Sequence, residues 1–133
     1  MSLKVIVYTP TKIICSTVTE EVVLPTLKAE MSIRPFHKQI MGVLPIGLLR
    51  IKNGKGWNLY VTLGGIAEFV DDKLTIFVRN AEEVNSVDLK NIEEELTKAE
   101  SELKTAKDDQ EKIKASEKLQ KLSALLKATP YLN

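Results

Sequence analysis

The sequence is poor in the residues that build covalent and metal sites. Its 133 residues contain one cysteine, Cys15, and one histidine, His37. A single cysteine excludes a disulfide within the chain, and the usual Cys/His spacings of zinc sites are absent. We expect Cys15 to be a buried, unreactive thiol, because free cysteine packs as a small hydrophobic residue. The composition therefore predicts neither a metal site nor a disulfide scaffold.

Long apolar runs and an excess of charge are also missing. No segment approaches the roughly 20 apolar residues that cross a bilayer, and the opening MSLKVIVYTP is too short and too alternating for a signal peptide. The formal net charge is only +1, which argues against nucleic acid as a partner. We expect a protein that works where it is made, at most peripheral to a membrane.

The first part of the chain, up to about residue 80, has the two-residue period of β-strands. Short runs rich in Val, Ile, Thr and aromatic residues span 3–9, 16–24, 47–52, 57–63, 66–70 and 73–79. Turn signals separate them: Asn53-Gly54-Lys55-Gly56 predicts a hairpin turn, and Gly64-Gly65 predicts a bulge or a close backbone approach. Short strands without an intervening helical pattern indicate a β-sandwich or barrel.

The second part of the chain has a helical period instead. One apolar seam comprises Leu89, Ile92, Leu96, Ala99 and Leu103, and a second comprises Ala115, Leu119, Leu122 and Leu126. Narrow seams favour two antiparallel helices that bury them against each other. We therefore predict an α+β chain in sequence order, with a β-sandwich domain over 1–84 and a helical hairpin domain over 85–133.

The ends and charges of the second helix support this hairpin. Asp108 or Asp109 is suited to cap its start, and Glu111 could complete a capping box with Asp108. Thr129-Pro130 predicts its end. The first helix is acidic and the second is basic, so we expect some pairing between them. Four lysines on the second helix form either a solvated face or a docking surface for an acidic partner: Lys112, Lys114, Lys118 and Lys121.

The segment EMSIRPFHKQ, residues 30–39, is the one candidate for chemistry, because it holds His37. No GxSxG motif frames a serine, and the NGKG turn lacks the first glycine, the hydroxyl and the helix of a phosphate-binding loop. For a metal, Glu30 is a lone acidic candidate. A small hydrolase that uses His37 is one hypothesis, and a surface that another molecule contacts is the other.

Across nearly its whole length the sequence resembles the epsilon subunit of F-type ATP synthases. The opening MSLKVIVYTP looks like the plastid and cyanobacterial form, whose first strand ends in Thr-Pro. LGGIAEFVDDKLTIFVRNAE (63–82) resembles the paired glycines, two strands and Ala-containing exit of that family, and IGLLRIK (46–52) resembles its Gly-containing strand. The order and spacing of these segments, rather than any single motif, carry the resemblance.

The resemblance implies a non-catalytic rotor subunit at the foot of the central stalk. Its partners would be the gamma subunit, the c-ring and, through the hairpin, the catalytic alpha and beta subunits, where the hairpin restrains ATP hydrolysis. The location would be peripheral on the stromal side of the plastid thylakoid membrane, or else the cyanobacterial thylakoid or the cytoplasmic side of a bacterial plasma membrane. A holdase chaperone or adaptor with a β-domain and a coiled coil is the alternative.

The resemblance also assigns a role to residues 30–39. Glu30, Pro35 and His37 match the family's loop against the c-ring, so the implied ring contacts are Glu30, Met31, Ser32, Phe36 and His37. The loop departs from the family elsewhere: Ala29 and Ser32 replace glycines, Phe36 replaces Asn or Gly, and Lys38-Gln39 replaces Ala-Pro. The bacterial ATP-sensing pattern has no match in KIKASEKL, so we expect no cofactor.

Overall fold

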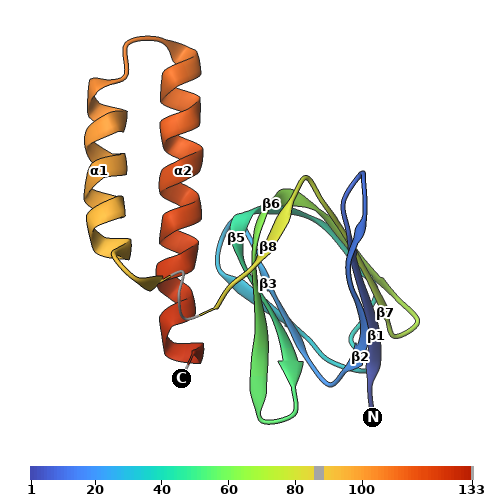
Figure 1. The fold of residues 1–133 in the computed structure, drawn as a ribbon. Helices are drawn as coiled ribbons and strands as arrows, with labels where there is room; N and C mark the ends of the chain where they lie inside the picture. The colour runs from blue at the N-terminus through green and yellow to red at the C-terminus, as the bar shows by residue number, and fades with distance from the viewer. Residues whose placement is uncertain (86–88, 133) are drawn as a thin grey trace.

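The computed structural model describes residues 1–85 and 89–132, which form a β-sandwich followed by two antiparallel helices (Figure 1). This confirms the predicted fold class. Within these residues the strands are β1 (Leu3–Tyr8), β2 (Ile13–Thr19), β3 (Val22–Pro25), β4 (Glu30–Ile33), β5 (Ile40–Asn53), β6 (Gly56–Val70), β7 (Lys73–Val78) and β8 (Ala81–Glu83). The helices are α1 (Ile92–Thr105), α2 (Asp109–Ala128) and the closing 3-10 turn η2 (Thr129–Tyr131).

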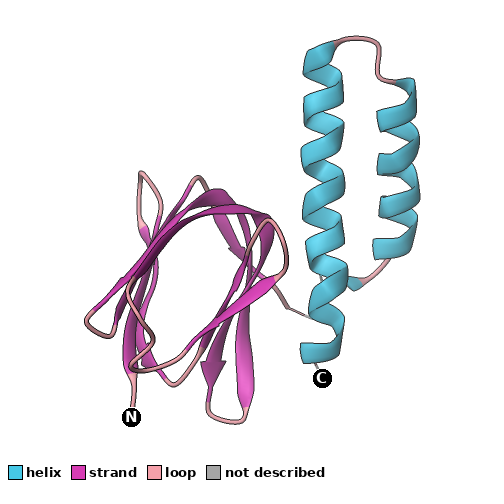
Figure 2. Ribbon diagram, turned by 180° about the vertical axis from the view of Figure 1, so that it is seen from behind, coloured by secondary structure: helices cyan, strands magenta, loops and turns pink. Residues whose placement is uncertain are grey.

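The strands form one hydrogen-bonded sheet that curves over a single core (Figure 2). Their order is β2-β1-β7-β6-β5-β3-β4, and β8 adds to β6. The β1–β7 pair is parallel and the other pairs are antiparallel. The core side chains come from nearly every strand: Leu3, Val5, Val7, Val22, Leu24, Ile33, Leu44, Leu49, Ile51, Tyr60, Ala67, Phe69, Leu74, Ile76, Val78 and Ala81.

Paired glycines bend the longest strand, as the sequence predicts. Gly64 has φ +84°, and a Cβ on Gly65 would lie 1.9 Å from the carbonyl oxygen of Phe77. The runs 57–63 and 66–70 are therefore one strand, β6, whose first half pairs with β8 and whose second half pairs with β7. The NGKG hairpin is also confirmed, with Gly54 at φ +62° and Asn53 paired with Gly56.

Other strand boundaries differ from the sequence interpretation. Residues 16–24 are not one strand, because the chain leaves β2 after Thr19 and enters β3 at Val22. The hydroxyl of Thr19 donates to the carbonyl of Lys52, 2.6 Å away, and fixes this break. Strand β5 begins at Ile40 rather than near Gly47, and β4 and β8 were not predicted. Short edge strands such as these have too few residues for a period to be visible.

The helices lie side by side, with α1 on the side of α2 away from the sandwich (Figures 1 and 2). Ile92, Ala99 and Leu122 are buried between them, with Leu96, Leu119 and Leu125 packed around. Two seam predictions were wrong at the ends. Leu89 precedes the helix, because Asn91 has a left-handed φ of 62°. Leu126 is 42% exposed, because the end of α2 turns Ala124 and Ala128 toward the sandwich instead.

The ends of α2 follow the sequence closely. Asp108 caps the helix: its Oδ1 accepts from the amide of Glu111 at 2.8 Å. The reciprocal half of the capping box is shifted by one residue, since Glu111 Oε2 accepts from the amide of Lys107 at 2.9 Å. The helix ends at Ala128, before Thr129-Pro130, as predicted. No helix among the described residues is long and apolar enough to cross a membrane.

The hairpin meets the sandwich through the end of α2. Ala124 and Ala128 pack against the outer faces of β5 and β6 and against the segment after β8. The apolar side chains that receive them are Leu48, Leu59, Val61 and Val84, with Trp57, Leu125, Tyr131 and Leu132 partly buried at the edge. Fewer apolar side chains are buried in this contact than in the sandwich core, so we expect it to hold the hairpin less firmly than the sandwich holds its own strands.

Candidate interaction site

Residues 30–39, expected to be a loop, begin as a strand. Glu30 to Ile33 form β4 at the edge of the sheet, paired with β3. Ile33 is fully buried in the core, whereas Glu30 and Ser32 are exposed. Ser32 donates its hydroxyl hydrogen to Glu21, and Arg34 Nε lies 3.5 Å from the same carboxylate. Met31 is 38% exposed. The strand therefore presents a polar edge rather than an enclosed site.

Glu30 and His37 lie near different ends of β5. The Oε2 atom of Glu30 lies 2.9 Å from Nη2 of Arg50, near the end of β5. The His37 ring lies edge-on to Phe69 at 6.0 Å, and Phe69 pairs with Ile40 at the beginning of β5. The structure thus places these two residues along one edge of the sandwich, and does not bring them together as one polar pair.

His37 has the contacts of a surface residue in the described part of the chain. Its Nδ1 lies 2.8 Å from the carbonyl oxygen of Lys38, and its ring is half-buried against Phe69. Catalysis by a histidine requires a nucleophile on one side and an orienting group on the other. The contacts of His37 supply neither, and no group of three possible metal ligands occurs among the described residues.

Phe36 is exposed and held in an uncommon backbone conformation. Its φ is +67°, in the left-handed region that bulky residues rarely adopt, and its side chain is 73% exposed. The amide of Phe36 donates to Oδ1 of Asp72 at 2.7 Å. The turn between β6 and β7 therefore holds the conformation, and the aromatic ring projects into solvent. Such strain is characteristic of functional positions.

The sequence interpretation missed an apolar face on β5 and β6. Met41, Val43 and Ile66 are 70%, 67% and 50% exposed, and Val43 pairs directly with Ile66. They lie on the strand ends that adjoin His37 and Phe69. The signal was present in IMGVLPIGLL, which is apolar at both odd and even positions and so indicates a strand covered on both faces.

The four predicted lysines of α2 divide into two kinds. Lys118 Nζ lies 3.7 Å from Glu102 of α1, and Lys121 Nζ lies 3.8 Å from Glu82 of β8. Lys112 and Lys114, near the start of the helix, are exposed and take part in none of the ion pairs between described residues. Among these four lysines, only Lys118 therefore forms the expected ion pair between the helices. The two lysines nearest the hairpin tip remain available for other contacts.

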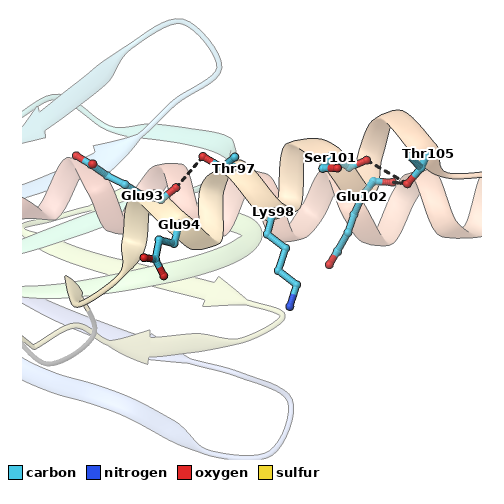
Figure 3. Close-up of a pocket in the computed structure, with 7 residues that line it drawn as sticks. All are labelled: Glu93, Glu94, Thr97, Lys98, Ser101, Glu102 and Thr105. Atoms are coloured by element: carbon cyan, nitrogen blue, oxygen red, sulfur yellow. Dashed lines mark hydrogen bonds between the residues drawn. The ribbon is translucent and has the colours of Figure 1, made fainter.

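Several hollows accompany the hairpin. A groove of about 790 Å³ lies between α2, the segment 25–30 and residues 45–48 of β5. A second hollow runs along α1 and is lined by this helix alone (Figure 3). The hydroxyls of Thr97 and Thr105 donate to carbonyls of their own helix, at 3.0 and 3.1 Å. Because its side chains come from one face of one helix, the second hollow has no convergent groups for a ligand.

Comparisons with known proteins point to one protein family. Residues 2–84 match the model of the ATP synthase delta/epsilon chain β-sandwich domain. The chain is 37% identical to the chloroplastic ATP synthase epsilon chain of Phaeodactylum tricornutum over the full length of both, and 35% identical to that of Gracilaria tenuistipitata, covering 99% and 98% of the two chains.

Solved structures show the same fold. A chain of the Euglena gracilis mitochondrial ATP synthase, from a structure of OSCP, F1 and the c-ring, superimposes with a TM-score of 0.82 at 19% identity, over 96% of this chain and 81% of the other. A chain from the central stalk and c-ring of the Tetrahymena thermophila mitochondrial enzyme gives 0.64 at 18% identity, over 97% of each.

Proposed function

Because this chain belongs to the family of ATP synthase epsilon chains, we propose that it is the central-stalk rotor subunit that links gamma to the c-ring of a proton-translocating F-type ATP synthase. The observation that carries the proposal is the division of the molecule. The sandwich has a continuous core and exposed edges for partners, whereas the hairpin is attached by a small contact. A rigid part can transmit torque, and a weakly attached part can exchange partners.

The c-ring binds the edge formed by β4 and the following turn. Glu30, Met31, Ser32, Phe36 and His37 are exposed or half-buried there, and the strained backbone at Phe36 keeps an aromatic side chain available for the partner. Polar residues next to one exposed aromatic suit short loops at the surface of a membrane ring.

Gamma binds the apolar face of Met41, Val43 and Ile66, which continues from that edge. An exposed apolar cluster on the face of a sheet favours a protein partner. We expect Glu30→Lys and His37→Ala to weaken assembly or coupling while the fold is retained. Glu20→Lys, which changes an exposed acid in the turn between β2 and β3, is the matched control. Normal proton-coupled synthesis in both edge variants would remove the c-ring assignment.

The hairpin restrains ATP hydrolysis when it leaves the sandwich and extends toward the alpha and beta subunits. Lys112 and Lys114 would meet acidic groups there, because their charges are free near the hairpin tip. Deletion of residues 89–133 tests this in the assembled enzyme and should raise hydrolysis several-fold. The double variant Lys112→Gln/Lys114→Gln should give part of that rise, and Lys127→Gln, at the other end of α2, should give none. Unchanged hydrolysis after the deletion would remove the inhibitory role.

The location that fits this function is the stromal side of the plastid thylakoid membrane, as a peripheral subunit. The relatives that carry this inference are chloroplastic epsilon chains that match along the whole sequence. Co-purification of the chain with a thylakoid rotor complex tests it. Recovery with a complex from another membrane would contradict the proposed location but not the proposed rotor function.

A further inference from the structure

The hairpin is fastened at its end by a stack around Arg50. The outer face of β5 carries Leu48, Arg50 and Lys52, while the intervening Leu49 and Ile51 are buried in the sandwich core. The Arg50 guanidinium lies 4.7 Å from the ring centre of Trp57 in β6 and 4.1 Å from that of Tyr131 in η2. The two rings are edge-on, 6.2 Å apart. One cation thus joins the two parts of the molecule.

The charge of Arg50 is nearly withdrawn from water. Its side chain is only 11% exposed, and Nε is buried without a hydrogen-bond partner among the described residues. The compensating groups are the faces of Trp57 and Tyr131 and the carboxylate of Glu30, whose Oε2 accepts a hydrogen bond from Nη2 at 2.9 Å. A desolvated guanidinium gains more from an aromatic face than an exposed one does, and it costs free energy once a compensating group is lost.

We propose that Arg50 and Tyr131 form a latch that holds the hairpin on the sandwich, and that Glu30 sets its strength. Departure of Tyr131 opens one side of Arg50 to water. When Glu30 is neutralised or drawn to another partner, the buried charge loses its counterion, and rehydration by release of the hairpin becomes favourable. Binding of a partner to Glu30 therefore promotes release of the hairpin. By thermodynamic linkage, release of the hairpin equally favours binding of that partner to Glu30.

This latch rests on the proposed function only for the identity of the partner that engages Glu30. The coupling between Glu30 and Tyr131 is a property of the isolated chain. Besides the apolar contact of Ala124 and Ala128, the described residues join the hairpin to the sandwich through the ion pairs of Arg79 with Glu117 and Lys121 with Glu82, and such pairs contribute little in water. The stack around Arg50 is the polar contact best shielded from water between the two parts.

Hydrogen exchange of the full-length chain tests the latch, read at the amides of residues 119–128 in α2. Tyr131→Ala should speed their exchange about tenfold, which corresponds to the loss of one desolvated cation–π contact. Tyr131→Phe keeps the ring and should exchange as the wild type does. Leu126→Ala removes an exposed side chain from the same helix and should also leave the rate unchanged. Unchanged exchange in Tyr131→Ala would overturn the latch.

The same measurement tests the coupling to Glu30. Glu30→Gln should speed exchange of α2 about threefold in the wild type and have no further effect in Tyr131→Ala. Glu21→Gln, an acid that pairs with Arg34 rather than Arg50, is the control. Amides of β1 and β7 report whether the sandwich stays folded. Independent, multiplying effects of Glu30→Gln and Tyr131→Ala would overturn the coupling, whatever the outcome of the assembly experiments.

Discussion

The sandwich and the hairpin use apolar residues in opposite ways. In the sandwich, strands that are far apart in sequence bury Val, Leu, Ile and Phe side chains in one continuous cluster. In the hairpin, three buried side chains form the seam, and one of them is an alanine. The sandwich is therefore held by many mutually supporting contacts. Helix α1 packs mainly on α2, and α2 has two narrow contacts, one with α1 and one with the sandwich.

This difference separates stability from exchange of partners. In the proposed rotor subunit, the part that transmits force would gain from a core in which no single contact decides the outcome. The part proposed to leave its neighbour would gain from a contact with few buried side chains. The following predictions test whether the two parts respond separately, and they run from the largest expected effect to the smallest.

Removal of the Phe69 ring should have the largest effect. Phe69 is 1% exposed and lies between β5 and β7 in the core. Phe69→Ala should lower the free energy of unfolding by about 3–5 kcal/mol, measured by urea denaturation. Phe36→Ala removes the same ring from a site that is 73% exposed and should change the stability little. A small loss in Phe69→Ala would mean that the sandwich core is less cooperative than its packing indicates.

Addition of a methyl group at Gly65 should cost about 1–3 kcal/mol or more. Its Cβ would overlap the backbone of β7, which cannot move without breaking the sheet. Gly42→Ala is the control, because a Cβ there meets nothing within 4 Å. Thermal unfolding of both variants measures the difference. Equal melting temperatures would show that the β6–β7 pair is loose at the bend.

The sandwich should also lose stability at high pH through Tyr60. Burial, with Cys15 and Glu83 as further causes, raises the pKa of Tyr60 above its usual value of about 10. Only the unfolded chain ionises this tyrosine just above pH 10, so the stability is complete below that pH and falls as pH rises. The slope is at most about 1.4 kcal/mol per pH unit. Urea denaturation from pH 9 to 11 should show a weaker decline in Tyr60→Phe, and identical declines would contradict the prediction.

Loss of the α2 cap should affect the hairpin alone. Asp108→Ala removes the acceptor for the Glu111 amide and should cost about 1 kcal/mol of helix stability. Asp108→Asn retains a capping oxygen and should cost much less. Hydrogen exchange should rise at the start of α2 and stay constant in β1 and β7. Faster exchange in the strands as well would mean that the two parts do not respond separately.

Periodicity made most of the fold predictable, and long-range pairing accounts for the rest. The helical seams, the Asp108 cap and the glycines at the β6 bend are local features that can be predicted from neighbouring residues in the sequence. The division of 16–24 into two strands is not local. It depends on the hydroxyl of Thr19 bonding to Lys52, 33 residues away. The exposure of Leu126 likewise depends on which face of α2 the sandwich occupies.

The candidate site was predictable in composition but not in geometry. Residue types alone predicted that His37 lacks catalytic partners; in the structure its Nδ1 lies near the carbonyl oxygen of Lys38 and its ring lies against Phe69. The sequence could not place Arg50 beside Glu30, because the two residues belong to different strands and Tyr131 completes their surroundings from the far end of the chain. The face of Met41 and Val43 was missed because β5 begins seven residues earlier than its clearest run, which starts at Gly47.

The alanines at the contact between α2 and the sandwich have a thermal consequence. The heat capacity change of any transition scales with the apolar area that it exposes to water. Ala124 and Ala128 contribute little such area from the helix side, whereas unfolding of the sandwich exposes a whole core. Release of the hairpin therefore has a smaller heat capacity change, and its free energy varies more nearly linearly with temperature, while the stability of the sandwich follows a strongly curved profile. Loss of the contact between α2 and the sandwich should therefore lack the pronounced temperature of maximum stability expected for unfolding of the sandwich.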